Sequence, residues 1–285
     1  MLAWIAQHPA VVIAAMFLLL AAAEAGIGRL RSANGSREDA PLEASITLLF
    51  AAVIYPGVLA LVGFLAGRWT PQLAGSLAHL PAWFMVVALL VADDLTQYWW
   101  HRASHTPLLW PLHRAHHSAP HMGVRVVYRN NFFYYALMPG IWIGAWLVFL
   151  GFGAVYPWYL IVKMIVIFGA HSELRWDRVL YARRWLHPLA WIVERTISTP
   201  ATHFAHHAMY QDDGVGHYRG NYGNLLFVWD VLFGTARITR RYPPLVGLVD
   251  DVAHGPERWQ VQLLYPLVKS HRARSALAED ATIVG

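Results

Sequence analysis

The 285-residue sequence contains no cysteine, and only 14% of its residues are charged. Without cysteine there can be no disulfide bonds, thiolate metal ligands or cysteine nucleophiles, so any bound metal must be held by nitrogen or oxygen atoms. A soluble domain has about a quarter charged residues, whereas this chain is 57% hydrophobic and holds 14 Trp. The composition is therefore typical of an integral membrane protein.

Charge is missing altogether from several long stretches, and these predict the membrane spans. Residues 1–23 and 44–67 carry no charged side chain, and about 20 apolar residues cross a bilayer. A cleaved signal peptide is the alternative for the first stretch, but it lacks a basic leading segment, so we expect a retained helix. Pro56 and Gly57 are expected to kink the second span.

A third span is expected from Ala82 to about Trp100, and it contains the acidic residues Asp93 and Asp94. An acidic pair inside a span indicates a functional site. The alternative is that the span ends near residue 92 and the pair lies at the membrane surface.

Residues 130–162 also lack charge and are too long for one span. Interruptions by Pro and Gly predict two helices there, at about 132–150 and 154–170, in a tight hairpin. Lys163 lies inside the second helix and is expected either to extend to the membrane surface or to face the protein interior.

The distribution of Lys and Arg predicts the orientation of the spans. If the N-terminus lies outside, segments 29–41, 101–131 and 171–285 are inside and hold three, four and 13 of the 22 basic residues. The positive-inside rule then places the C-terminus and every histidine cluster in the cytoplasm, and we expect a multi-pass protein of a bacterial inner membrane. Because the positive charges follow this topology, the net charge of +5 does not indicate a nucleic-acid partner.

Nine of the 16 histidines form four groups with spacings that suit metal binding. Two groups share the pattern H-x-x-H-H and one pair is four residues apart, so each of these would lie on one face of a helix. The groups are His101 with His105; His113, His116 and His117; His171 alone; and His203, His206 and His207. Imidazole is the commonest metal ligand, and nine ligands suit two metals better than one. Ordinary core or surface histidines would explain any single member, but not three clusters.

Longer motifs surround these histidines. They are Asp94-x-x-x-Tyr-Trp-Trp-His101-Arg-x-x-His105, His113-Arg-x-His-His117-Ser, Thr199-Pro-x-x-His203-x-x-His-His207, Asn221-Tyr-Gly and Trp229-Asp-x-Leu-Phe-Gly-Thr. Together they cover roughly residues 82–236 and resemble the fatty acid hydroxylase / sterol desaturase superfamily.

The resemblance implies a membrane-embedded helical fold with a cytoplasmic cap and a centre of two iron ions, with zinc possible in the isolated protein. It also implies hydroxylation or desaturation of a membrane lipid with O2 as cosubstrate. By position, it implies all nine histidines as metal ligands and Asp94 and Asp230 as supporting catalytic residues. We expect both carboxylates to accept an imidazole N–H and so orient the ring; pairing with an arginine such as Arg102 or Arg114 is the alternative.

The chain departs from this pattern at two points. In the family a histidine often follows the arginine that matches Arg129, where this chain has Asn130 and Asn131. Fatty acid 2-hydroxylases of the superfamily have a histidine four residues after the one that matches His171, where this chain has Arg175. One metal is therefore expected to keep an open position, or His187, His121 or Asn221 replaces the missing ligand.

Oxidation of a lipid C–H bond needs two electrons from outside the chain. The sequence has no C-x-x-C, no G-x-G-x-x-G and no haem-binding motif. We therefore expect a separate reductase, ferredoxin or cytochrome to dock on the basic cytoplasmic face, at a patch that includes Arg183 and Arg184. The lipid is expected to enter laterally from the bilayer. The run Phe132 to Tyr135 and the span Met138 to Leu150 are candidates for the channel, although lipid-facing packing is the expectation for most of their residues.

The predicted fold is thus an all-α integral membrane protein with four to five transmembrane helices and a cytoplasmic helical cap that holds a histidine-rich dimetal site. We expect N-terminal transmembrane helices at 1–80, a catalytic domain at 81–240 and a C-terminal cytoplasmic tail at 241–285, poorly ordered beyond about 270. The favoured function is O2-dependent lipid hydroxylation of a monooxygenase type. A desaturase with the same site, a membrane zinc hydrolase and a metal transporter are the alternatives, although the protease motif H-E-x-x-H is absent.

Overall fold

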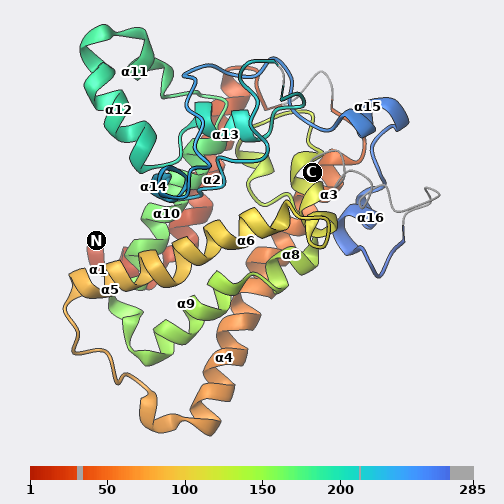
Figure 1. Cartoon of the computed structure of the whole chain (residues 1–285). Coiled ribbons are helices and arrows are strands. Elements are labelled where there is room, and N and C mark those ends of the chain that lie inside the picture. Colours follow the sequence, from red (N-terminus) through yellow and green to blue (C-terminus); the bar gives the residue numbers. More distant parts are fainter. Residues whose placement is uncertain (31–34, 212, 270–285) are drawn as a thin grey trace.

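The computed structural model describes residues 1–30, 35–211 and 213–269 of the chain (Figure 1). The predicted disorder beyond residue 270 lies outside these residues. Apart from isolated bridges of Ile197 with Leu226 and of Ala208 with Val246, the described part of the chain is made of helices and turns. The all-α prediction is confirmed.

Three helices are long and apolar enough to cross a membrane, judged by length and composition over the described residues. They are Pro9–Gly26, Asp39–Trp69 and Phe132–Leu150, and the apolar helix Tyr156–His171 is shorter. The helix that starts at Ala82 carries the acidic pair and is not among the three. The chain is therefore a membrane protein by these three helices, and the count of four to five spans stays a prediction.

The N-terminal stretch is not one helix. Helix α1 covers Leu2–Gln7, and α2 covers Pro9–Gly26. His8 between them has φ and ψ of −127° and 49°, outside the helical region. The ring of the proline that follows disfavours the helical conformation at this residue. The expected helix at 1–23 is therefore wrong in its bounds, and the span runs from Pro9 to Gly26.

The second span contains a π-helical turn where the sequence predicts a kink. Helix α3 (Asp39–Leu49) continues through the π-turn η1 (Phe50–Ile54) into α4 (Tyr55–Trp69). Pro56 has no N–H for the preceding turn, and a wider turn is one way for a helix to accommodate that loss.

The helix from Ala82 also contains a π-helical turn, at the acidic pair Asp93 and Asp94. Helix α5 (Ala82–Leu89), the π-turn η3 (Leu90–Leu95) and α6 (Thr96–Ser104) follow one another without a break. Both aspartates of η3 are buried. The π-turn therefore directs two consecutive acidic side chains into the protein, and it leads directly to the first histidines.

The remaining helices complete the body and a set of shorter helices, α7 and α11 to α15, which we call the cap. They are α7 (Trp110–His117), α8 (Phe132–Ala136), α9 (Pro139–Leu150), α10 (Tyr156–His171), α11 (Arg178–Ala182), α12 (His187–Thr196), α13 (Pro200–His206), α14 (Val228–Leu232), α15 (Val249–His254) and α16 (Trp259–Leu264). Figure 1 shows the segment from α11 to α15, coloured green to blue, around one end of the long helices, while α4 reaches the opposite end. Helix α16 packs against α3 and α7.

The largest core cluster lies between α3–α4 and α8–α9. Leu42, Ile46 and Val58 are buried there against Tyr135 and Ile141. This packing places the aromatic residues of α8 beside the histidines of α7, and so joins the membrane helices to the cap.

Candidate metal centre

The nine histidines converge from the C-terminal ends of four helices. His101 lies near the end of α6, and His105 caps that helix. Helix α7 ends at His117, α10 ends at His171, and α13 ends at His206 with His207 as its cap. Because a helix C-terminus carries partial negative charge, four such ends favour a bound cation.

Local sequence explains where two of these helices start, and therefore where their histidines lie. Helix α13 begins with a capping box in which the Thr199 and Thr202 side chains bond each other's backbone N–H groups, and Pro200 occupies its first turn. Helix α7 likewise has a proline, Pro111, in its first turn. Both features fix the start of a short helix.

The histidines divide into two buried groups, and in each group one nitrogen per residue lies within 4.8 Å of all the others. The five-histidine group is His101, His105, His113, His117 and His206. The four-histidine group is His116, His171, His203 and His207. All nine predicted ligands are therefore brought together, in two sets.

Each H-x-x-H-H motif contributes to both groups, which corrects the expectation of one shared face. His113 and His117 belong to the five-histidine group, whereas His116 belongs to the other. On a helix, positions i and i+4 differ by only about 40°, while i+3 lies about 100° from i+4. One short helix can therefore supply ligands to two neighbouring metals.

Backbone carbonyls determine which imidazole nitrogen is free. In four histidines Nδ1 lies 2.7–3.0 Å from a carbonyl oxygen. The pairs are His101 with Tyr222, His116 with Arg129, His171 with Ile167 and His206 with Gly220. A carbonyl can only accept, so Nδ1 carries the hydrogen and Nε2 keeps its lone pair for a metal.

Several other nitrogens of the two groups are buried without any hydrogen-bond partner. They include both nitrogens of His105 and His207 and the Nε2 atoms of His113 and His117. A buried polar atom without a partner is costly, and one metal ion in each group would give one nitrogen of each of these histidines a partner.

Two pairs of nitrogens have the spacing of neighbouring metal ligands. Nε2 of His206 lies 2.9 Å from Nε2 of His101, and Nε2 of His203 lies 2.9 Å from Nε2 of His171. Two nitrogens at right angles, each about 2.1 Å from one metal, would be about 3 Å apart. The nitrogen-only donor set therefore fits one metal ion in each group.

Burial also keeps the imidazoles in the form that binds metal. It lowers the pKa of His105, His113, His116 and His117 well below the ordinary value, and repulsion among neighbouring imidazoles adds to this effect. The pKa values of His203, His206 and His207 are lowered for the same reasons. These side chains are therefore neutral at physiological pH.

The two predicted supporting carboxylates hold a loop and contact neither an imidazole nor an arginine by hydrogen bond. Asp94 accepts hydrogen bonds from the backbone of Leu225 and Leu226, at 3.3 and 3.1 Å, and from the indole of Trp229 at 2.8 Å. The expected direct contact with an imidazole is wrong, because backbone and indole N–H groups occupy this carboxylate.

Asp230 acts on the ligands through the same loop. It accepts hydrogen bonds from the backbone of Tyr222 and Gly223, at 2.9 and 2.6 Å, and from the Thr235 hydroxyl at 2.6 Å. Burial raises its pKa, and these donors oppose the rise. The loop that Asp230 holds supplies the carbonyls of Tyr222 and Gly220, which orient His101 and His206.

Sequence reasoning missed these carbonyls, because any residue has one. The only signal was the Asn221-Tyr-Gly motif. Asn221 has a φ of 57°, a left-handed conformation that asparagine tolerates better than most residues. Its side chain donates to the carbonyls of Thr202 and Arg237, at 2.9 and 3.0 Å. The motif therefore builds the loop that carries the two acceptors.

None of the residues expected to replace a missing ligand joins either histidine group. His121 lies 2.8 Å from Glu43, His187 lies 3.0 Å from the carbonyl of Tyr181, and Asn221 is used in the loop. Arg175 stacks over the rings of Phe204 and Tyr242. His171 belongs to the smaller group, so the departure at Arg175 falls on the four-histidine group.

Both groups face one cavity of about 100 Å³ between the membrane helices and the cap. His101 and His113 of one group and His116 and His171 of the other line it. Much of the remaining wall is aromatic or aliphatic. Tyr134, Tyr135, Met138, Gly140 and Ile141 contribute to it, whereas Phe132, Phe133 and residues 142–150 do not. The expected channel residues therefore divide between the cavity and packing elsewhere.

A buried ion pair lies in the wall of this cavity. Lys163 Nζ on α10 is 2.6 Å from Asp93 Oδ2 on η3, and the hydroxyl of Tyr159 donates to the same oxygen at 2.8 Å. Both charged residues line the cavity. Lys163 therefore faces the protein interior, which was one of its two expected positions.

Comparison with known proteins agrees with this site. Residues 86–235 match the family model described as fatty acid hydroxylase. The alkylglycerol monooxygenase of Xenopus tropicalis is 28% identical over 176 residues, which are 60% of this chain and 34% of the relative. That of Danio rerio is 28% identical over 195 residues, or 65% of this chain and 37% of the relative.

The matched region thus spans about a third of the length of these curated relatives. No solved structure matches the chain. The family match covers more than half of the sequence and includes all nine histidines of the two groups. The chain therefore belongs to the fatty acid hydroxylase family.

Proposed function

We propose that this protein is a membrane-bound lipid hydroxylase of the monooxygenase type that uses O2 and two iron ions. The observation that carries the proposal is the cavity, because histidines of both groups face it and much of its remaining wall is apolar. Such a wall suits a lipid chain and excludes water from the reacting carbon. The three apolar helices support access from the bilayer.

Iron held by the two groups would supply the activation of O2, which no side chain can provide. The residues of the chain would bind the iron, orient the lipid and exclude water. The five-histidine group and the four-histidine group present neutral imidazoles, and the carbonyls of Gly220, Tyr222 and Arg129 fix three of the rings. The departure at Arg175 leaves one group with fewer ligands, which suits an exchangeable position there.

The names of the two relatives support a lipid substrate. Both are alkylglycerol monooxygenases. Insertion of one oxygen atom from O2 into a C–H bond also consumes two electrons and two protons and releases water. We propose that a separate donor protein supplies these electrons from the cytoplasmic side, as the distribution of basic residues indicates.

The proposed docking patch includes Arg183 and Arg184, which are both exposed. Charge reversal of both arginines is expected to slow product formation in cells, because charge complementarity steers docking. The matched control is Arg68→Glu at the end of α4, an exposed arginine outside the cap. Equal rates for the two variants would rule out this patch.

The experiment that tests the reaction compares the wild type with a His116→Ala/His206→Ala variant, which loses one ligand from each group. Total lipid extracts of the expressing cells are analysed by high-resolution mass spectrometry. A lipid heavier by one oxygen atom in the wild type alone is expected, and it identifies the substrate.

A product lighter by two hydrogens would establish a desaturase instead. If the folded, iron-loaded protein changes no lipid when a reductase system is co-expressed, the hydroxylase proposal is wrong. Zinc without O2 consumption in such material would support a hydrolase.

A further inference from the structure

The two histidine groups are held by different parts of the chain. The loop that orients His101 and His206 is held by Asp94 and Asp230, and both acids lie inside the family-matched region 86–235. The contacts that fix His116 and His171 instead lead to buried acids on the N-terminal helices, before that region.

The first link runs from His116 to helix α3. Nδ1 of His116 donates to the Arg129 carbonyl at 3.0 Å, and Nε of the same arginine donates to the Ala115 carbonyl at 2.8 Å. The fully buried guanidinium is in turn 2.7 Å from Asp39 and 3.2 Å from Glu43. Arg129 thus contacts the end of α7 through both its carbonyl and its side chain. Two carboxylates of α3 hold the arginine in turn.

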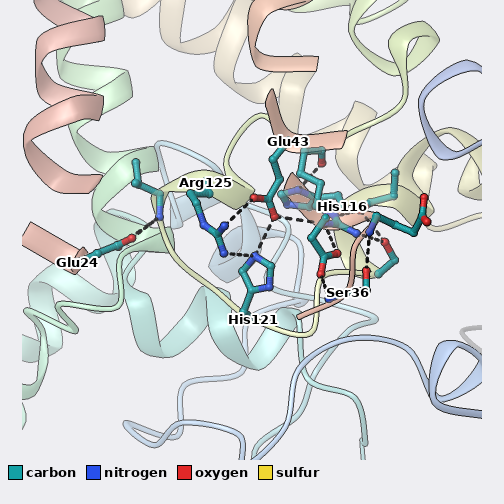
Figure 2. A network of polar contacts seen from close by, with 12 residues as sticks. Glu24, Ser36, Glu43, His116, His121 and Arg125 are labelled. Carbon is teal, nitrogen blue, oxygen red and sulfur yellow. Dashed lines mark hydrogen bonds and ion pairs between the residues drawn. The ribbon is translucent and has the colours of Figure 1, made fainter. Parts of the chain in front are cut away.

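Glu43 has further partners, so it forms the centre of a network (Figure 2). His121 Nε2 lies 2.8 Å from its Oε1, and a guanidinium nitrogen of Arg125 lies 3.4 Å from its Oε2. The side chain of Glu43 is only 5% exposed. The segment from His121 to Arg129, which follows the ligand helix, is therefore fastened to α3 at three side chains.

The second link runs from His171 to helix α2. The Glu24 carboxylate is buried, and it accepts hydrogen bonds from the backbone of Val124 and Glu173 and from the Ser172 hydroxyl, all at 3.0 Å for the closer oxygen. Ser172 follows the ligand directly. Glu24 therefore holds the end of α10 against the segment after α7.

The fit around Glu24 is close. Gly123 donates from its backbone to the His171 carbonyl at 2.9 Å. A Cβ atom at this glycine would lie 2.8 Å from a Glu24 oxygen, and its φ is 124°. Only glycine therefore allows α2, the segment after α7 and the end of α10 to meet here.

We propose that Glu24, Asp39 and Glu43 are positioning residues of the four-histidine group, so that α2 and α3 set the affinity of one of the two metals. This inference rests on the proposed binding of two metals. Both tethered ligands, His116 and His171, belong to the four-histidine group. That group has one ligand fewer than the other, and correct placement of each remaining ligand therefore matters more.

The test is anaerobic titration of the purified full-length protein with Fe²⁺ in detergent, with bound iron counted per chain. The wild type is expected to bind two. Glu43→Gln removes one of the two carboxylate charges that hold Arg129. Glu24→Gln replaces one acceptor oxygen with an amide nitrogen, which cannot accept a hydrogen bond. Each variant is expected to keep one tight iron and to bind the second about 10–100-fold more weakly, the usual effect of losing a residue that orients a ligand.

The matched control is Glu194→Gln. Glu194 is also buried and paired with an arginine, at 2.8 Å to Arg240, but it lies on α12, which supplies no member of either histidine group. Thermal unfolding of the apoproteins separates loss of fold from loss of metal. If Glu43→Gln does not fold, Glu24→Gln on the other helix carries the same test.

Ligand variants show which iron is weakened. His207→Ala removes a ligand of the four-histidine group, and His105→Ala removes one of the five-histidine group. Glu43→Gln is expected to weaken iron binding further in the His105→Ala background and to change little in the His207→Ala background, because effects at one site are not additive.

Equal weakening of both irons, or behaviour like that of Glu194→Gln, would overturn the positioning role and leave the two-metal proposal intact. A wild type that binds no iron would overturn both.

Discussion

His101 donates a hydrogen bond of 2.7 Å from Nδ1 to the backbone carbonyl of Tyr222, whose own N–H is bound by Asp230 at 2.9 Å. A carboxylate that touches no imidazole therefore determines the orientation of a predicted metal ligand through a single residue, Tyr222. Loss of a residue that orients a metal ligand typically lowers metal affinity about 10–100-fold.

Asp230→Asn is expected to weaken iron binding at the five-histidine group by about 10–100-fold. The amide nitrogen would face a backbone N–H of Tyr222 or Gly223, so one hydrogen bond becomes a repulsive contact. Anaerobic Fe²⁺ titration measures the change, with Glu194→Gln as the control for a buried carboxylate elsewhere. Unchanged binding would show that the loop keeps its shape without the carboxylate.

The ion pair of Lys163 and Asp93 predicts a non-additive pattern of stability. Loss of one member of a buried pair leaves an uncompensated charge and costs about 3–5 kcal/mol, whereas replacement of both often costs little. Lys163→Met is therefore expected to destabilise the protein strongly. The double variant Lys163→Met/Asp93→Asn is expected to recover much of that loss, since the amide can still accept from Tyr159.

Chemical unfolding in detergent measures both variants. Arg195→Met is the control, because the Arg195 side chain is 35% exposed and its partner Glu194 keeps Arg240. Exposed pairs contribute about 0–1 kcal/mol. Equal destabilisation by the single and double variants would mean that packing in the cavity wall, and not charge, determines stability here.

The sequence predicted that the nine histidines come together, since they are a rare residue type in repeated patterns. All nine lie in the two buried groups, and their role as metal ligands stays a prediction. Their division into groups of five and four was not predictable, because it depends on how four helix ends meet. The H-x-x-H-H motif alone suggests that its three histidines share one face of a helix. In the structure the histidines at i and i+4 belong to one group and the histidine at i+3 belongs to the other.

The sequence predicted the helices that a long apolar stretch determines. It did not predict the contacts of side chains whose partners are distant in sequence. The span at 44–67 lies within Asp39–Trp69. The span at 132–150 coincides with the candidate span Phe132–Leu150, which α8 and α9 form with a break at residues 137–138. The buried acids Glu24 and Glu43 belong to no motif, and their partners lie 78 or more residues away. A lone acid at the end of an uncharged span was the available signal.

Gly140→Ala is expected to destabilise the protein by about 1–3 kcal/mol, the usual cost of overpacking. A Cβ atom at residue 140 would overlap the Asp93 carboxylate, which Lys163 and Tyr159 hold in place. The control is Gly63→Ala on α4, where a Cβ atom meets nothing within 4 Å. It is expected to be neutral or slightly stabilising. Unfolding in detergent compares the two, and equal stability would show that the carboxylate moves freely.

Iron should stabilise the folded protein, and the histidines that respond should be those of the two groups. An ion that binds only the native state adds about 2.7 kcal/mol at a concentration 100-fold above its Kd. One ion in each group would also give one unpartnered nitrogen of His105 and one of His207 a partner. Added Fe²⁺ is therefore expected to raise the thermal unfolding temperature of the wild type under anaerobic conditions.

The rise should shrink in His105→Ala and persist in His187→Ala, because His187 is outside both groups and bonds only the Tyr181 carbonyl. Chelation should reverse it. Both nitrogens of His105 lack a hydrogen-bond partner, so its side chain is free to bind iron. A full rise in His105→Ala would therefore mean that the iron binds elsewhere on the chain.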